Sequence, residues 1–257
     1  MSGGARPDGE AGTAGAAGAA EIAATGVIGG FFALRTGAPP AGTDPAPAAT
    51  PLAAVYAGDT APLARRIDLV ADRLGARERR VAASIAQFGL AARLWSVALG
   101  SAALHGTLPA LRPGDLRWTP DRTTPDDLLL TDPGTLTASV AAIRAAVQEA
   151  HLVPLAAAVR RDTRISPGLL WGNAGSALAG AVREIDAWAR RTGRTDAADR
   201  ARALADGLFD HPDLARTVRD PGMRRTTCCL HYRVGGGLCG DCAFDTPPGA
   251  REAASDG

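Results

Sequence analysis

The chain has 257 residues with 28 basic and 27 acidic side chains, and its formal net charge is +1. This length fits one large domain or two small ones with a substantial core, while the balanced charge excludes a strong bulk attraction to nucleic acid or a membrane surface. Every basic residue is Arg and the chain is rich in Ala, Gly and Pro, which is typical of GC-rich coding sequence, so the Arg content alone is weak evidence for anion binding.

Residues 1–55 consist mostly of Ala, Gly, Pro and Thr. Such a composition buries too little apolar surface to offset the entropy of the chain, so we expect a disordered arm. Within it, GVIGGFFAL (26–34) is a candidate to dock on the body or to form a short helix. That stretch is far shorter than the roughly 20 residues that span a bilayer, and no signal-peptide pattern precedes it. The sequence therefore predicts no membrane span and a cytoplasmic location, where thiols stay reduced.

A helical domain is expected over residues 56–215. From Arg77 onward, apolar residues recur at helical steps of three and four, which predicts a long central helix. These residues are Val81, Ile85, Phe88, Ala92, Trp95 and Leu99. The stretches DLRW (115–118) and DLLLT (127–131) predict two short strands, a minor two-stranded β element in a mainly α fold.

A second helix is expected from about Thr137, and Pro154 should end it and open a further turn. A third begins with Ser166 as N-cap and Pro167 at the first helical position. Gly193 stands where a C-terminal cap glycine belongs. Residues 195–209 read as a fourth helix, and the three histidines outside the cysteine-rich segment are interpreted as structural.

Small residues in the third helix, GNAGSALAGA (172–181), would let another backbone approach closely. They favour tight helix packing, and Trp171 and Asn173, which open the helix, are interpreted as residues for packing and a local hydrogen bond. They do not form a phosphate-binding glycine pattern of the kind used for nucleotides.

All four cysteines, Cys228, Cys229, Cys239 and Cys242, fall in one short segment near the end of the chain. Disulfides are disfavoured in a reducing cytosol. A structural zinc site would use the Cys-x-x-Cys unit at 239–242 as one half. Its other half fits poorly, because the adjacent side chains of Cys228 and Cys229 diverge, and His231 would have to substitute for one of them.

A [2Fe-2S] cluster suits this spacing better, because its two irons need four terminal thiolates spread over a larger area. The glycine-rich stretch before Cys239 also supplies free backbone N–H groups. Such groups stabilise an anionic cluster and raise its potential. The residues therefore favour an iron–sulfur cluster, with zinc as the alternative.

The segment TTCCLHYRVGGGLCGDCAF (226–244) resembles the C-terminal signature of the FhuF-type ferric-siderophore reductases. That signature has a Cys-Cys pair, a loop rich in aromatic and basic residues, and Cys-Gly-Asp-Cys. Residues 165–181 are similar to an internal helix of the family around its Trp-Gly-Asn, and residues 80–104 to its first long helix. One departure is that nine residues separate Cys229 from Cys239, where ten are expected.

The resemblance implies that the four cysteines ligate a [2Fe-2S] cluster, held by a segment over residues 216–246 that precedes a flexible tail over 247–257. It also implies one-electron reduction of Fe(III) in hydroxamate siderophores, with release of Fe(II) in the cytosol. The chemistry is consistent with this, since Fe(III) is gripped by anionic oxygen ligands and Fe(II) far more weakly. Two alternatives are a non-enzymatic iron- or siderophore-binding protein and a zinc-stabilised interaction module.

The electrons are expected from a ferredoxin or a flavoprotein, because no nucleotide or flavin motif is found in the sequence. Candidate contacts for the siderophore or for an acidic partner are Arg224, Arg225, His231, Tyr232 and Arg233. No catalytic residue is expected beyond the cluster, because electron transfer needs no covalent catalysis.

Overall fold

The computed structural model describes the backbone of residues 8–15 and the complete residues of 16–38, 49–219, 222–235 and 237–248. Its longer helical elements are α1 (Asp8–Ala24), α2 (Leu52–Ala57), α3 (Ala61–Leu74), α4 (Arg79–His105), α5 (Val140–Ile143), η3 (Arg144–Leu152), α6 (Val153–Asp162), α7 (Pro167–Thr192) and α8 (Thr195–Phe209). Its short 3₁₀ turns are η1 (Thr25–Val27), η2 (Gly30–Phe32) and η4 (His231–Val234). Its strands are β1 (Arg35–Thr36), β2 (Thr50–Pro51), β3 (Thr107–Pro109), β4 (Leu116–Trp118), β5 (Leu128–Leu130), β6 (Thr135–Thr137), β7 (Val218–Arg219) and β8 (Arg224–Arg225).

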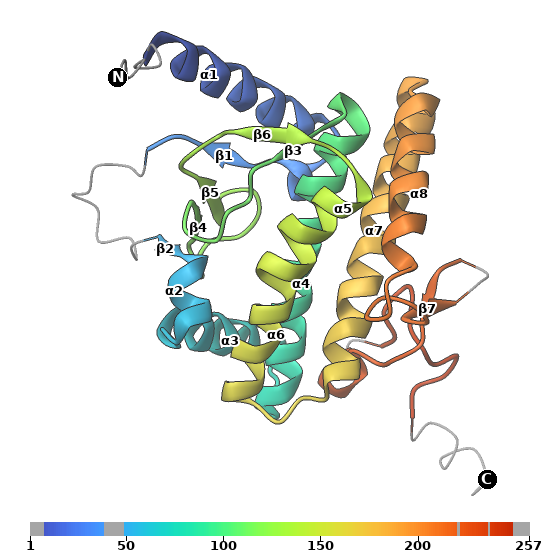
Figure 1. Cartoon of the computed structure of the whole chain (residues 1–257). Coiled ribbons are helices and arrows are strands. Elements are labelled where there is room, and N and C mark those ends of the chain that lie inside the picture. The colour runs from blue at the N-terminus through green and yellow to red at the C-terminus, as the bar shows by residue number, and fades with distance from the viewer. Residues whose placement is uncertain (1–7, 39–48, 220–221, 236, 249–257) are drawn as a thin grey trace, which may run out of the picture.

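The fold is mainly α, and α4 runs through its centre (Figure 1). Helices α7 and α8 pack on one side of α4, and α3 packs on another. Trp95, Leu94 and Leu99 on α4 are fully buried. The long helix expected from Arg77 is therefore confirmed, and it is the element around which the core is built.

The start and stop signals of α7 act as predicted. The Oγ atom of Ser166 accepts a hydrogen bond from the N–H of Leu169 at 3.2 Å, and Pro167 occupies the first turn. Gly193 ends the helix with φ of 70°, in the left-handed region. Because these signals are local, they could be read directly from the sequence.

The helix expected from Thr137 begins at Val140, with Ser139 as its cap. Pro154 does mark a boundary, since η3 gives way there to α6. The helical path nevertheless continues through the proline instead of breaking. The turns before it are π-helical, and this wider spacing commonly accompanies an interruption of the usual backbone ladder.

Two predicted strands form, but the sheet is larger than the minor element that was expected. Strands β4 and β5 pair antiparallel, with Leu116 opposite Leu130. The N-terminal segment adds β1 parallel to β5 and β2 antiparallel to β4, which makes a four-stranded sheet of order β1-β5-β4-β2. Strands β3 and β6 form a separate antiparallel pair.

The expectation of a disordered arm over residues 1–55 is wrong for its described part. Ile22, Ile28, Phe32 and Leu34 are all buried in the main hydrophobic core. Gly100 on α4 makes room for this docking, because a Cβ there would lie 2.5 Å from the ring of Phe32. The alternative that GVIGGFFAL (26–34) docks on the body is confirmed, because it contains Ile28, Phe32 and Leu34 and forms the short turns η1 and η2. Residues 1–7 and 39–48 lie outside the described structure.

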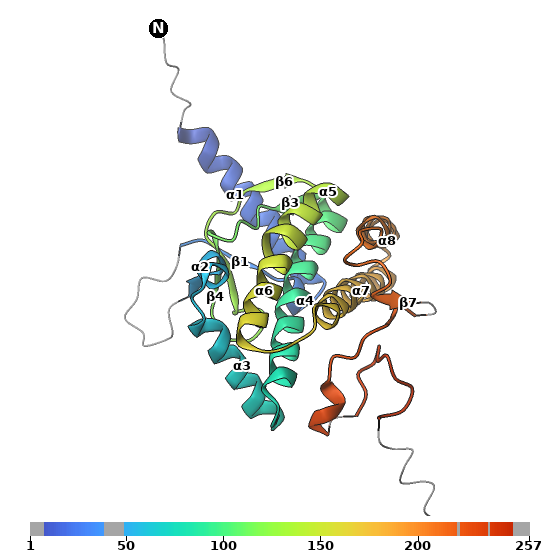
Figure 2. The ribbon, with the colours of Figure 1, turned by 60° about the horizontal axis from the view of Figure 1, so that its bottom comes forward.

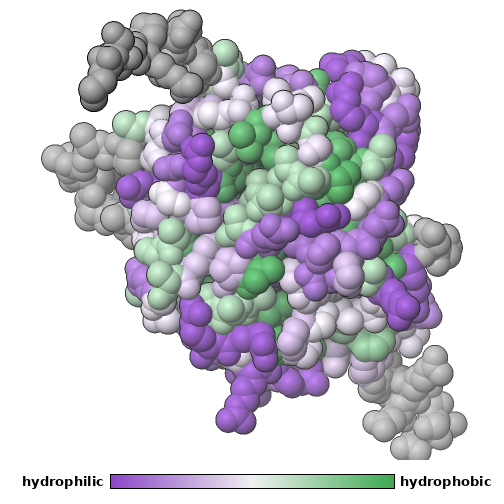
Figure 3. Space-filling model, in the orientation of Figure 1, coloured by the Kyte–Doolittle hydropathy of each residue, from purple (hydrophilic) through white to green (hydrophobic). Residues whose placement is uncertain are grey.

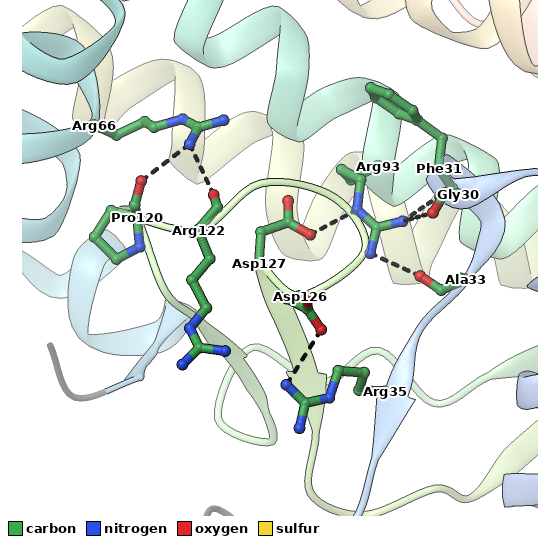
Figure 4. A network of polar contacts seen from close by, with 10 residues as sticks. All are labelled: Gly30, Phe31, Ala33, Arg35, Arg66, Arg93, Pro120, Arg122, Asp126 and Asp127. Carbon is green, nitrogen blue, oxygen red and sulfur yellow. Dashed lines mark hydrogen bonds and ion pairs between the residues drawn. The ribbon is translucent and has the colours of Figure 1, made fainter. Parts of the chain in front are cut away.

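A buried arginine fastens the N-terminal segment to α4 (Figure 4). The Nε of Arg93 pairs with Asp127 Oδ1 at 3.0 Å. Its terminal nitrogens donate to the backbone carbonyls of Gly30, Phe31 and Ala33. One guanidinium thus satisfies a buried carboxylate and three carbonyls of a segment that has little regular structure of its own.

One helix among the described residues, α4, is long and apolar enough to cross a membrane. In this structure 78% of its most apolar window is buried inside the fold, as in the core helix of a globular protein. On the face shown in Figure 3, hydrophobic residues form patches that polar residues interrupt. The apolar character of α4 is thus used for internal packing and is weak evidence for a membrane span.

His151 joins three elements through both of its ring nitrogens. Nε2 lies 2.7 Å from the carbonyl of Leu111, to which it donates, and Nδ1 lies 2.9 Å from the hydroxyl of Tyr56, from which it accepts. These partners fix the neutral tautomer. Burial lowers the pKa of His151 from its ordinary 6.5 to about 4.

Acidification should therefore destabilise the fold through His151. Between pH 6.5 and about 4 the unfolded chain binds a proton that the folded chain does not, so stability falls as the pH falls through this window. The loss should approach about 3 kcal/mol. His151→Gln can retain both hydrogen bonds but cannot titrate. Urea unfolding at several pH values should give a flatter profile for this variant, and equal slopes would contradict the prediction.

The N-terminal docking predicts a sharp contrast between neighbouring phenylalanines. Phe32 is 2% exposed and Phe31 is 45% exposed. Phe32→Ala should lower the free energy of unfolding by about 3–5 kcal/mol, because it opens a cavity in the core. Phe31→Ala, the matched control, should change it by less than about 1 kcal/mol. Similar urea midpoints for the two variants would show that the segment is not part of the core.

Candidate metal centre

The cysteine-bearing segment lies against α7, on the side of the molecule away from the four-stranded sheet (Figure 2). It begins with the antiparallel pair β7–β8, in which Val218 lies opposite Arg225. The chain then passes the adjacent cysteines, makes the 3₁₀ turn η4, and closes with the turn from Cys239 to Cys242.

Glycines on α7 allow this segment to approach closely. A Cβ on Gly172 would lie 1.8 Å from Thr227 Oγ1, and a Cβ on Gly175 would lie 1.9 Å from Thr217 Oγ1. Any side chain at these two positions would collide with the segment. The expected close approach to these small residues is confirmed, but the partner is the irregular segment that carries the cysteines, which contacts the glycines through threonine side chains, and not another helix.

Asn173, between those glycines, is the centre of a buried polar network. Its amide nitrogen lies 3.0 Å from the carbonyl of Ser84 and 3.0 Å from Gln87 Oε1 on α4. Its amide oxygen accepts a hydrogen bond from Arg225. Ser84 Oγ in turn donates to the carbonyl of Cys229 at 2.8 Å. The network links both long helices to the first pair of cysteines.

The four thiols gather at one end of this network. Cys229 and Cys242 are 4% and 5% exposed, whereas Cys228 and Cys239 are half-buried. The sulfurs of Cys229 and Cys239 lie 3.7 Å apart. Two thiolates on one tetrahedral metal with bonds of about 2.3 Å would lie roughly 3.8 Å apart. The structure thus brings one cysteine of each pair to a spacing that suits a shared metal ion.

Backbone N–H groups point at the sulfurs. The N–H of Leu230 donates to Cys228 Sγ at 3.2 Å, and the N–H of Phe244 donates to Cys242 Sγ at 3.5 Å. Burial raises the pKa of the Cys228 thiol. Burial and then the neighbouring Cys229 raise the pKa of Cys239 to about 12. These two thiols resist ionisation, so a cationic centre is needed to hold them as thiolates.

Arg225 supplies positive charge beside this site. Its residue is 1% exposed, and among the described residues it forms no ion pair with a carboxylate. Its Nε is buried without a hydrogen-bond partner in that same part of the chain. A buried cation normally requires a negative partner. An iron–sulfur cluster with four thiolate ligands is anionic, so the residues present fit such a group.

A single zinc ion fits less well. Within the described ranges, no group of three or more His, Cys, Asp or Glu residues is close enough to bind one metal ion. The sulfurs of Cys229 and Cys239 form a close pair, and four cysteines in one segment match the four terminal thiolates of a two-iron cluster, which spread over a larger area than the ligands of one tetrahedral ion.

The other predicted contact residues have specific structural partners. Arg224 donates to the carbonyl of Cys242 from both Nε and Nη2, at 3.1 and 2.7 Å, so it fastens the second cysteine turn to β8. Arg233 pairs with Glu78 at 2.6 Å, just before α4. Tyr232 packs edge-to-face on Phe244 at 5.9 Å.

Two predicted contacts need correction or refinement. Arg225 was expected to face a siderophore or partner, but its burial excludes direct contact in this structure. His231 is half-buried, and its Nδ1 has no hydrogen-bond partner among the described residues. Sequence reasoning also missed Ser84 and Gln87, although polar residues on an otherwise apolar helix were a usable signal.

Comparison with known families agrees with the site. Residues 225–244 match the FhuF 2Fe-2S C-terminal domain, which supports the FhuF-type family although the match is short. It also indicates a [2Fe-2S] cluster as the cofactor. No curated protein matches the chain. Cys228, Cys229, Cys239 and Cys242, all inside the matched range, are the residues that would hold the cluster.

The buried charge of Arg225 leads to a prediction about potential. Arg225→Gln can keep a hydrogen bond to Asn173 but removes the positive charge. In the wild-type protein that charge stabilises the reduced cluster, which is more negative than the oxidised one. The reduction potential should fall by roughly 60 mV, a tenfold change in a one-electron equilibrium. Spectroelectrochemistry measures the shift. Arg190→Gln, an exposed change on α7, is the matched control, and equal potentials for the two variants would refute the role.

Proposed function

We propose that the protein reduces Fe(III) bound by hydroxamate siderophores in the cytosol and releases the iron as Fe(II). The observation that carries the proposal is the gathering of four cysteines beside a buried arginine that forms no ion pair among the described residues, in a segment that matches the FhuF 2Fe-2S C-terminal domain. The [2Fe-2S] cluster, when bound, supplies a one-electron carrier.

The electron balance requires an external donor. One electron enters from a reduced ferredoxin or flavoprotein and leaves to Fe(III), which becomes Fe(II), while no bond within the chelator breaks. Because the hard anionic oxygens of the chelator hold Fe(II) more weakly, this single transfer releases the metal and leaves the siderophore intact.

The residues of the chain have three tasks in this scheme. The buried positions of Cys229 and Cys242 keep water away from two ligands. The N–H groups of Leu230 and Phe244 donate to sulfur and stabilise its negative charge. Arg225 adds a fixed positive charge in a site from which water is largely excluded, where its effect on a nearby anion is strong.

An acidic electron donor has a smaller basic surface to use than the sequence indicated. Arg233 is 37% exposed at its side chain, and Arg224 is 35% exposed, but both already pair with carboxylates. We therefore expect donor docking to depend on Arg233 and Arg224 and to weaken with salt, as exposed pairs do.

Single-turnover reduction tests the proposal. Protein reduced with dithionite and freed of excess reductant is mixed with a ferric tris-hydroxamate and a ferrous chelator. Fe(II) should appear in an amount equal to the electrons stored in the cluster, as the cluster spectrum returns to its oxidised form. Cys239→Ser is the control, because a hard alkoxide replaces a soft thiolate and disrupts the cluster. If the cluster of the wild-type protein stays reduced in the presence of the ferric complex, the proposed reductase function is refuted.

A further inference from the structure

A cavity of about 330 Å³ lies between α4 and α7, next to the cysteine segment. The N-terminal turn η2 forms one wall through Gly30 and Phe31, and Phe88 on α4 forms another. Asp241, from the turn between the last two cysteines, also lines it. Elements from the beginning, middle and end of the chain therefore meet around one space.

The space exists because α7 presents small residues to it. Ser176, Ala177, Gly180 and Ala181 lie on one face of the helix and line the cavity. Interiors of proteins are normally close-packed, so such a row would ordinarily receive bulky neighbours. Here the facing residues of α4 include Ala92 and Ser96, which leave the volume open.

Buried hydrogen bonds fix the backbone of the wall that carries Phe31. The carbonyls of Gly30 and Phe31 accept hydrogen bonds from the buried guanidinium of Arg93 (Figure 4). The side chain of Phe31 nevertheless remains on the surface, since the residue is 45% exposed. Together with Phe32 and Phe88, it gives the cavity an aromatic wall, and ligand-binding cavities are lined mainly by aromatic and apolar side chains.

The opposite wall belongs to the metal centre. Asp241 stands between Cys239 and Cys242, and Ser176 on α7 donates a hydrogen bond to its carboxylate. A molecule in the cavity therefore touches the turn that carries two of the four thiols, while Cys242 stays 5% exposed behind it. Because Asp241 directly precedes Cys242 in the chain, a molecule at this wall lies next to the turn that holds these thiols.

We propose that this cavity binds one face of the ferric siderophore complex, an inference that rests on the proposed function. Its volume is at the low end for a drug-sized ligand, roughly 300–1,000 Å³, so part of the complex stays in solvent. Three hydroxamates balance Fe(III) and give an uncharged complex, whereas three catecholates give a trianion. Among the described lining residues, the two carboxylates of Asp241 and Glu184 outnumber the arginine, Arg183, so the lining disfavours the trianion.

Binding can be separated from reduction with Ga(III), which forms complexes of the same shape but takes no electron under these conditions. The probe is the Ga(III) complex of a linear tris-hydroxamate, titrated calorimetrically into oxidised wild-type protein with its cluster. The decisive variant is Gly180→Leu, because a Cβ there meets only Arg183 Nη2, at 3.7 Å, and can fill the cavity without a backbone clash. Gly89→Leu is the matched control on α4, where a Cβ meets nothing within 4 Å.

Gly180→Leu should weaken Ga(III) complex binding by about tenfold or more, and Phe31→Ala should weaken it as well. Gly89→Leu should bind like wild type, and the visible spectrum should show the same cluster in every variant. Unchanged binding in Gly180→Leu, or equal wild-type binding of a Ga(III) tris-catecholate, would overturn the proposal. If wild-type protein reduces the ferric complex but does not bind the Ga(III) complex, the cavity proposal is overturned, while the proposed reductase function stands. A different outcome would separate the two proposals in the other direction. If wild-type protein binds the Ga(III) complex, Gly180→Leu abolishes that binding, and wild-type protein reduces no ferric complex, the cavity is supported as a binding site and the reductase function is refuted.

Discussion

The position of the metal centre depends on the buried amide of Asn173. Its oxygen must face Arg225, which can only donate, and its nitrogen must then face the acceptors Ser84 and Gln87. This complementarity leaves one orientation of the amide and one placement of the cysteine segment relative to both long helices. The spacing of α4 and α7 and the location of the thiols are therefore set together, by side chains that are distant in sequence.

Much of the helical scaffold and the identity of the cysteine site were accessible from sequence, because their signals are local. Ser166 and Gly193 cap α7 through contacts within one or two turns. The segment containing the four cysteines shows its chemistry through ligand type and spacing. Glycines at 172 and 175 indicated a close approach, although the sequence alone did not identify which segment approaches.

The parts that sequence reasoning missed depend on long-range contacts. Arg93 and Arg225 look like any surface arginine in the sequence, and only the fold supplies the carbonyls and amide that surround them. Ile22 is an isolated apolar residue in a segment rich in Ala and Gly, so an average over residues 1–55 predicted disorder, although the apolar stretch 26–34 was recognised as a candidate to dock. Strand β1 is only two residues long and forms because β5 is available beside it.

The two buried arginines, Arg93 and Arg225, differ in whether a carboxylate neutralises their charge. Arg93 has its counter-charge in Asp127, so its charge is neutralised within the fold and its remaining donors are used to fix the wall that carries Phe31. Arg225 forms no ion pair among the described residues, and its backbone N–H donates to the carbonyl of Asp241 at 3.0 Å. Each arginine thus positions one wall of the cavity, but Arg225, whose guanidinium lies over the ring of Phe88 and forms no ion pair among the described residues, can stabilise an anionic cluster. Because both walls are fixed by buried groups, the shape of the cavity beside the cysteine segment is set by the fold itself.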